Sequence, residues 1–398
     1  MTATPPDDDA GTTPVVTETD AGTTAPPAPV CGDGHVDTQL GEGCDDGNDS
    51  PYDGCRPDCT VVTPVTAPAR TWTWFDVPGT QCIDGKTAGF AASINPDSPN
   101  LMIYLEGGGA CFNDACDFST INVPYFPPPD GIFNRDNDGN PVRDWSMVYV
   151  PYCTGDIHGG DADTELGGAV RHFHGYSNIR KFLELWTATF PERRRVLLTG
   201  ISAGGFGAGL NFPQVADAFA HAGAPEMSLI DDSGPPFGND VIPRCLQENF
   251  RTVWGLDRTV LAACGADCTD PDDFATGIIT HVAAHYPDAR MGVFSNSQDT
   301  VIRTFMGFGW GNGQHDNCGG VPLIVPADAY GDGLLALRAR LHDRAGTFFV
   351  GANRWQDDFG LGHTALRSPT YWTTVVDDVS VEAWLGRVIN GEPLEVGP

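Results

Sequence analysis

The pentapeptide GISAG at residues 200–204 constrains the fold of this chain more than any other segment. It follows the apolar run at residues 196–198 and precedes a glycine-rich stretch typical of a helix start. A strand, a tight turn and a helix in this order place the central serine, Ser202, on an exposed turn, where the flanking glycines make room for it. The alternative is an ordinary glycine-rich turn between a strand and a helix. The context predicts Ser202 as a nucleophile.

Short apolar runs alternate with amphipathic stretches from about residue 71 onward. The strand-like runs lie at residues 100–105, 145–153, 194–202, 227–234, 290–299 and 346–353, and the helical stretches at 177–190, 203–222, 334–346 and 379–389. This alternation predicts an α/β fold with a mainly parallel sheet flanked by helices. No internal repeat is visible.

A second glycine-rich loop, LEGGGA at residues 105–110, follows an earlier predicted strand. Hydrolases with a serine on a strand-to-helix turn place one oxyanion-hole donor in such a loop, and the other is the backbone N–H after the nucleophile, here Ala203. Glycine lets the backbone approach the developing negative charge closely. A phosphate-binding loop is excluded because no Lys-Ser/Thr pair follows the glycines.

A catalytic triad on this frame requires an acid and then a histidine downstream of Ser202. His363 lies in the glycine-flanked segment FGLGHTAL, after a predicted strand and before the last predicted helix. Asp299 follows the strand before that one, whereas Asp231 and Asp232 follow a still earlier strand. The acid must reach the Nδ1 proton of the histidine. We therefore predict Asp299 as the acid, with Asp231 or Asp232 as the alternative and otherwise as supports of the turn.

Other histidines have simpler interpretations. His281 and His285, four residues apart, suggest zinc, but they lack the glutamate of an HExxH motif and mark one face of a helix. His342 lies in a predicted helix beside Asp343 and is interpreted as a solvated surface residue. The sequence predicts no metal ion and no organic cofactor for the chemistry.

Twelve cysteines, an even number with several close pairs, indicate an oxidising compartment and up to six disulfides. Buried thiols with a zinc site are the alternative. No leader with a charged and then an apolar segment opens the sequence, so an export signal is expected to have been removed or to lie outside it. No run of 18 apolar residues occurs, so no transmembrane helix is predicted.

Charge limits the partners. The chain has 53 acidic and 22 basic residues, a net charge of −31. Because of this negative charge, we do not expect the protein to bind nucleic acids or anionic lipid surfaces. The same charge repels polyanionic substrates at long range.

Four segments are predicted from composition. Residues 1–30 contain no Lys or Arg and are expected to form a disordered acidic linker. Residues 31–60 carry four cysteines and seven aspartates, and a unit with so little apolar content requires disulfides or a metal. Residues 61–70 form a second linker, and residues 71–398 the catalytic domain.

Several motifs together resemble one family. LEGGGACF, VPYCTGDIHGG, RHFHGYSNIR, LTGISAGGFGAG, DDSGPPF, SNSQDTVIRTF and GHTAL occur in this order over about residues 72–391, as in the pectin acetylesterase family, which includes the animal Notum carboxylesterases. The resemblance implies an α/β-hydrolase-like serine esterase with the triad Ser202, Asp299 and His363 and an oxyanion hole around Gly109, Ala110 and Ala203. It also implies the disulfides Cys82–Cys153, Cys111–Cys116, Cys245–Cys318 and Cys264–Cys268.

This chain departs from the family at Ala110, where members commonly carry tryptophan after the glycine run. The backbone donor is retained, but a large wall of the pocket is missing, unless Phe112 or Trp310 fills the space. Residues 31–60 separately resemble cysteine-rich repeats of surface and secreted proteins of myxobacteria. Their Asp and Asn oxygens suit either calcium or Asx turns, and residues 134–141 pose the same choice.

The sequence thus predicts a secreted or surface-displayed serine carboxylesterase, expected to be a monomer. It hydrolyses O-acyl esters, O-acetyl before others, with acylated polysaccharide as a candidate substrate. Two alternatives stay open: an esterase acting on fatty-acyl, aryl or polymeric esters, and a surface binding module on a hydrolase scaffold.

Overall fold

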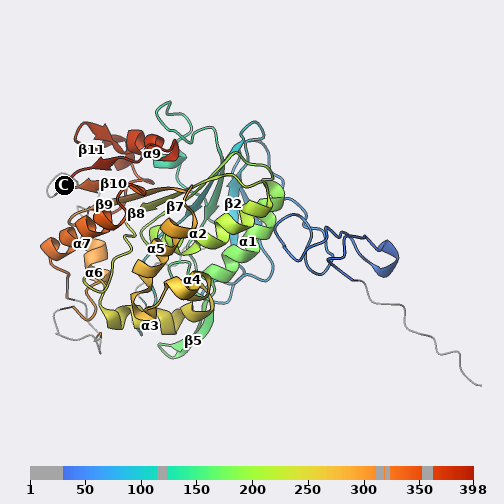
Figure 1. Ribbon diagram of the computed structural model, residues 1–398, viewed down its shortest axis with the longest axis horizontal. Coiled ribbons are helices and arrows are strands. Elements are labelled where there is room, and N and C mark those ends of the chain that lie inside the picture. The colour runs from blue at the N-terminus through green and yellow to red at the C-terminus, as the bar shows by residue number, and fades with distance from the viewer. Residues whose placement is uncertain (1–29, 115, 117–122, 311–317, 319–322, 352–361) are drawn as a thin grey trace, which may run out of the picture.

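A computed structural model describes residues 30–114, 116, 123–310, 318, 323–351 and 362–398 (Figure 1). The expected linker at 1–30 falls almost entirely outside these residues. Among the described helices, none is both long and apolar enough to cross a bilayer.

A nine-stranded sheet forms the centre of the molecule, in the order β1-β2-β4-β3-β7-β8-β9-β10-β13. Its strands are β1 (Thr73–Asp76), β2 (Gly89–Ser93), β4 (Ser146–Val150), β3 (Asn100–Leu105), β7 (Arg195–Ile201), β8 (Glu226–Asp232), β9 (Arg290–Asn296), β10 (Ala345–Val350) and β13 (Glu395–Val396). The pairs β1·β2 and β2·β4 are antiparallel, and every pair from β4 to β13 is parallel. The predicted mainly parallel α/β sheet is thereby confirmed.

The central strands of the sheet are apolar and buried along almost their whole length, so both of their faces must be shielded from water. One apolar layer covers each face. Along β3, Ile103 and Leu105 pack into one apolar layer, and Met102 and Tyr104 into the other. Successive side chains of a strand point to opposite faces, so a continuous apolar run supplies both layers.

The larger layer contains the helices α1 (Gly175–Thr189), α2 (Ala203–His221), α3 (Arg244–Trp254), α4 (Val260–Cys264), α5 (Phe274–His285), α6 (Thr300–Phe305) and α7 (Ala327–Arg340). The smaller layer contains α8 (Thr370–Thr373) and α9 (Val381–Ile389). Figure 1 shows α9 on one side of β9 and β10, and α2 to α5 on the other.

The sequence patterns locate α1, α2 and α9 well, but both boundaries of the predicted helix at residues 334–346 are wrong. The helix predicted at residues 334–346 begins earlier, at Ala327, and ends at Arg340, so His342 and Asp343 lie in a turn. Asp343 adopts a positive φ of 64°, a conformation that a helix excludes.

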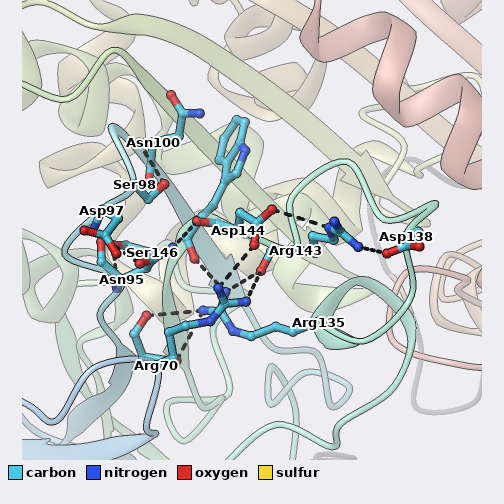
Figure 2. A network of polar contacts seen from close by, with 12 residues as sticks. Arg70, Asn95, Asp97, Ser98, Asn100, Arg135, Asp138, Arg143, Asp144 and Ser146 are labelled. Carbon is cyan, nitrogen blue, oxygen red and sulfur yellow. Dashed lines mark hydrogen bonds and ion pairs between the residues drawn. The ribbon is translucent and has the colours of Figure 1, made fainter.

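A polar network fixes the edge of the sheet that lies at the amino ends of β3 and β4 (Figure 2). The Arg135 guanidinium donates to the carbonyls of Arg143 and Trp145, and burial lowers its pKa to about 10. Ser146, the first residue of β4, accepts from the backbone N–H of Asn95 at 3.1 Å. In residues 134–141, Asn134 and Asn137 accept backbone N–H groups two residues on, which is the Asx-turn alternative.

All twelve cysteines are paired. Two disulfides, Cys31–Cys59 and Cys44–Cys55, close residues 31–60. The described backbone of this segment forms the short 3-10 helix η1 (Thr38–Leu40) and an isolated β-bridge from Cys55 to Val61. The other four pairs coincide with those that the family resemblance implies. Within the small segment, Asp45 accepts backbone N–H groups from Gly32, Gly34 and Gly47, so this carboxylate folds the loop.

These disulfides give a direct prediction about redox state. Alkylation of the denatured, unreduced protein should leave its mass unchanged, and alkylation after reduction should add adducts at all twelve cysteines. Intact-mass spectrometry measures both. Alkylation of most cysteines without prior reduction would contradict an oxidising compartment.

Candidate active site

Ser202 stands between β7 and α2 in a rarely populated backbone conformation, with φ 54° and ψ −123°. Its backbone N–H donates to the Asp232 carbonyl at 2.8 Å. The turn is so tight that a Cβ on Gly204 would lie 2.0 Å from the Leu105 carbonyl oxygen, and one on Gly200 would lie 2.3 Å from the Gly204 oxygen. Only glycine fits these two positions, which explains the spacing of the GISAG motif.

The glycine loop after β3 packs directly against this turn. A Cβ on Gly107 would meet the Ile201 carbonyl at 2.6 Å and the Ser202 side chain at 2.8 Å. Gly109 and Ala110 of the loop line the same pocket as Ser202 and Ala203. The four residues predicted for nucleophile and oxyanion hole therefore surround one cavity.

His363 and Asp299, 64 residues apart, are in contact. Nδ1 of His363 lies 2.7 Å from Oδ2 of Asp299, whose side chain is fully buried. The other oxygen of Asp299 caps α6 by accepting the backbone N–H of Ile302 at 2.9 Å. Since a carboxylate accepts hydrogen bonds, Nδ1 carries the proton and the neutral ring keeps Nε2 as its basic nitrogen.

Asp232, an alternative acid, binds backbone instead. Its Oδ2 accepts the N–H groups of Ala365 and Leu366, each at 2.7 Å, and its Oδ1 accepts the Ser233 hydroxyl. Ser233 in turn accepts the backbone N–H of Thr364 at 3.2 Å. Because Ser202 also donates to the Asp232 carbonyl, the end of β8 holds both the serine turn and the segment that carries His363.

Asp231, the other alternative, accepts the backbone N–H of Gly234 at 2.8 Å and lines the pocket. Burial raises its pKa to about 8, and raises that of Asp232 to about 6. The Asp231 carboxyl is therefore mostly protonated at neutral pH. It adds little charge to the pocket wall.

These raised pKa values predict a pH dependence of stability. Between pH 4 and pH 8, roughly, the native state holds a proton on Asp231 that the unfolded state releases, so the contribution of this carboxyl to the free energy of unfolding falls as pH rises. In Asp231→Asn this fall should be shallower by about 1 kcal/mol or more. Urea unfolding at both ends of the range measures it, and an equally steep fall in the variant would contradict the assignment.

The sequence did not indicate four supporting residues, Glu106, Tyr149, His158 and Arg367. Glu106, buried under the glycine loop, accepts from the Tyr149 hydroxyl at 2.7 Å and pairs with Arg367 at 2.8 Å. His158 contacts the Glu106 carbonyl through Nε2 at 2.9 Å, and burial lowers the pKa of its ring. Glu106 and His158 lie within the motifs LEGGGACF and VPYCTGDIHGG. Glu106, however, contacts His158 and Arg367, which are 52 and 261 residues away, so no local pattern in the sequence indicates these contacts.

The pocket beside Ser202 is the most apolar of the pockets among the described residues, although two surface hollows away from Ser202 have larger volumes. Its cavity volume is about 60 Å³, counted as the space open to the centre of a water molecule, so the pocket is narrow. Its walls are mainly apolar side chains from α2, α3, α5 and α6, among them Phe206, Leu210, Phe250, Phe274, Ile278 and Phe305. Apart from Ser202, Asp231 and Gln247 are its polar lining side chains. Such a pocket suits an apolar group attached to the reacting carbonyl.

The other histidines considered in the sequence, His281, His285 and His342, contact acidic side chains outside the candidate active site. His281 and His285 share one partner, Asp267, at 2.9 and 2.7 Å, at the C-terminal end of α5. His342 contacts Asp343 and Glu395 on the surface.

Comparison with known proteins gives one family. Residues 75–270 match the pectinacetylesterase family model. Over 168 residues the chain is 32% identical to the palmitoleoyl-protein carboxylesterase NOTUM of Mus musculus and 31% identical to that of Homo sapiens, which covers 38% of this chain and 33% and 34% of those proteins. The chain thus matches about a third of the length of these relatives.

The fold has a solved counterpart. The structure of the Wnt deacylase Notum from Drosophila superposes with a TM-score of 0.60 at 20% sequence identity, covering 82% of this chain and 96% of that chain. At this identity the likeness concerns the fold, and it extends beyond the residues that match in sequence. The cysteine-rich repeat at 31–60 stays a prediction. The family match covers residues 75–270, just under half of the chain, and it confirms the predicted resemblance to the pectin acetylesterase/Notum-type family.

Proposed function

We propose that this protein is a serine carboxylesterase that acts through Ser202, His363 and Asp299. The observation that carries the proposal is the 2.7 Å contact between His363 Nδ1 and the buried Asp299, in a site whose serine occupies a strained turn. Asp299 fixes the tautomer and orientation of the ring, so that Nε2 is the basic nitrogen. The relatives are named carboxylesterases, which agrees with this chemistry.

In the proposed reaction, His363 takes the proton of the Ser202 hydroxyl as the oxygen attacks an ester carbonyl. The negative charge of the tetrahedral intermediate falls among the backbone N–H groups of Gly109, Ala110 and Ala203. His363 then protonates the leaving alcohol, and an acyl-enzyme remains. Water, activated by the same histidine, releases the acid and restores the serine.

The pocket favours an acyl group longer than acetyl. An acetyl group would leave most of its apolar wall unused, whereas an alkyl or alkenyl chain would bury its methylenes against α2, α5 and α6. The neutral form of Asp231 keeps charge out of this wall. Relatives are named palmitoleoyl-protein carboxylesterases, which also supports a fatty-acyl ester. O-acetyl ester hydrolysis, on polysaccharide or elsewhere, is the second candidate and rests on the pectinacetylesterase match.

A chain-length series of p-nitrophenyl esters tests the acyl preference. Each methylene buried contributes about 0.8 kcal/mol, so kcat/KM should rise by up to about fourfold per methylene until the pocket is filled. Acetylated pectin and xylan, assayed beside the series, test the second candidate. A maximum at acetate with a steady fall thereafter would contradict the fatty-acyl assignment.

A surface binding module on an inactive scaffold remains the alternative from another class. A fluorophosphonate that reacts with activated serines separates the two. It should label Ser202 stoichiometrically and abolish ester turnover. An unlabelled, folded protein would favour the binding module.

The six disulfides support export to an oxidising compartment, so we place the enzyme outside the cell or on its surface. The net charge of −31 disfavours demethylated pectin as a substrate because both carry negative charge.

A further inference from the structure

A two-stranded hairpin, β5 (Ala162–Leu166) and β6 (Ala169–Phe173), gathers two aspartates and two histidines outside the candidate active site. Asp163 lies directly opposite His172 in the antiparallel pair. Asp161, one residue before β5, contacts His174, one residue after β6. The hairpin lies beside α3 at the edge of the molecule (Figure 1).

Three of these side chains converge on one point. Oδ1 of Asp163 lies 2.6 Å from His172 Nδ1 and 3.0 Å from His174 Nε2, and the three atoms lie within 4.8 Å of one another. Zinc bonds imidazole nitrogen and carboxylate oxygen at about 2.0–2.2 Å, so neighbouring ligand atoms stand roughly 3 Å or a little more apart. Only small side-chain movements separate the observed positions from such a shell.

Asp161 adds an observation that a chance cluster would not supply. Its Oδ1 lies 2.9 Å from Nδ1 of His174, the ring nitrogen that faces away from Asp163. A histidine that ligates a metal through one nitrogen almost always donates the other N–H to a carboxylate, which fixes its tautomer. The backbone of Asp161 is itself held, since its N–H donates to Trp254 and its carbonyl accepts from Arg258.

The histidines are also partly enclosed. The side chains of His172 and His174 are 23% and 21% exposed, although the hairpin that carries them has few buried residues. The other edge of the His172 ring faces Gly85, where a Cβ would lie 3.7 Å from the ring atoms. The Asp163 side chain is 57% exposed, so solvent reaches the cluster and water would be the fourth ligand.

We propose that Asp163, His172 and His174 bind a divalent transition metal, zinc before others, with Asp161 as the residue that orients His174. Two imidazoles and one carboxylate favour zinc over calcium and magnesium, which prefer oxygen ligands. The metal would join β5, β6 and the start of α1 at Gly175. Its role is structural, because a two-stranded hairpin with little buried surface is weakly stable by itself.

Zinc titration of the full chain, produced without a histidine tag and stripped with EDTA, tests this proposal. The second His/His/Asp group of the described residues, Asp267 with His281 and His285, is removed in all samples by His285→Ala. Calorimetry of this background should show one zinc per chain with a dissociation constant in the micromolar range or below. Magnesium in excess should not displace it.

Variants of the hairpin decide the assignment. His172→Ala and His174→Ala should each abolish measurable zinc binding, and the conservative Asp161→Asn should weaken it by about 10- to 100-fold. Far-UV circular dichroism checks that each variant is folded. The proposal is overturned if the background protein takes up no zinc, or if Asp161→Asn and the histidine variants bind it as the background does. Hydrogen bonds of the two histidines to Asp161 and Asp163, without a metal, would then explain the cluster.

Discussion

Replacing Ser202 by alanine should lower ester turnover by about a thousandfold or more while the protein remains folded. The substitution removes the proposed nucleophile but keeps the turn, whose shape depends on Gly200 and Gly204 and on the hydrogen bond from residue 202 to the Asp232 carbonyl. Alanine has a Cβ, as serine does, and bears the same backbone strain at this positive φ. The free energy of unfolding should therefore change little. Steady-state hydrolysis of a p-nitrophenyl ester and urea unfolding measure the two effects.

His363→Ala should be about as severe, and the double variant little worse than either single one, since triad members act as a unit. Asp299→Asn tests the acid, because the amide favours the wrong tautomer of His363. A matched control is Asp267→Asn, which alters a second aspartate–histidine contact away from Ser202 and should leave turnover unchanged. If Ser202→Ala retains more than about a tenth of the activity, the proposed mechanism is wrong.

The sequence predicted the parts of this site that have a local signature. The turn at Ser202 and the loop packed against it both require glycines at fixed positions, so the motifs GISAG and LEGGGA are visible in the sequence. A continuous apolar run, typical of a buried strand, precedes each motif. His363 and Asp299 were harder, because nothing local links two residues 64 positions apart. The topology supplied the link, since both follow strands that end at the same edge of a parallel sheet.

Other elements lacked such a signal. β1 and β2 are short and antiparallel, at the edge of an otherwise parallel sheet, and the strongly amphipathic α3 follows a loop with no clear boundary signal. Asp232 was expected to support a turn, yet its partners at 365 and 366 are set by tertiary packing alone. The hairpin histidines occurred within a quoted family motif, and only the pairing of β5 with β6 places Asp161 and Asp163 beside them.

Ala110→Trp should change the acyl preference of the enzyme rather than its chemistry. Ala110 is buried and lines the pocket beside Ser202, so a tryptophan there would enter the space that we assign to the acyl chain. Its backbone N–H, a proposed oxyanion donor, stays in place. Excluding about four methylenes at about 0.8 kcal/mol each predicts a roughly two-hundredfold lower kcat/KM on long esters. p-Nitrophenyl acetate should stay within a few fold.

The competing outcome is that other side chains already occupy the place of the missing tryptophan. Phe112 packs edge-on against Phe250 and Phe308, each with ring centroids 5.0 Å away, and Phe250 belongs to the pocket wall. Trp310, the other candidate, is not among the described residues that line the pocket. The aromatic cluster around Phe112 thus stands beside the cavity and leaves it open at Ala110.

Stability distinguishes the two outcomes. If the added indole has no room, overpacking should lower the free energy of unfolding by about 1–3 kcal/mol and depress turnover of all esters alike. If the pocket is open, the unfolding midpoint should change little while the chain-length profile shifts toward acetate. Ala110→Leu, which adds a smaller side chain at the same position, should give an intermediate profile. A well-folded Ala110→Trp protein with an unchanged profile would show that the acyl chain binds elsewhere.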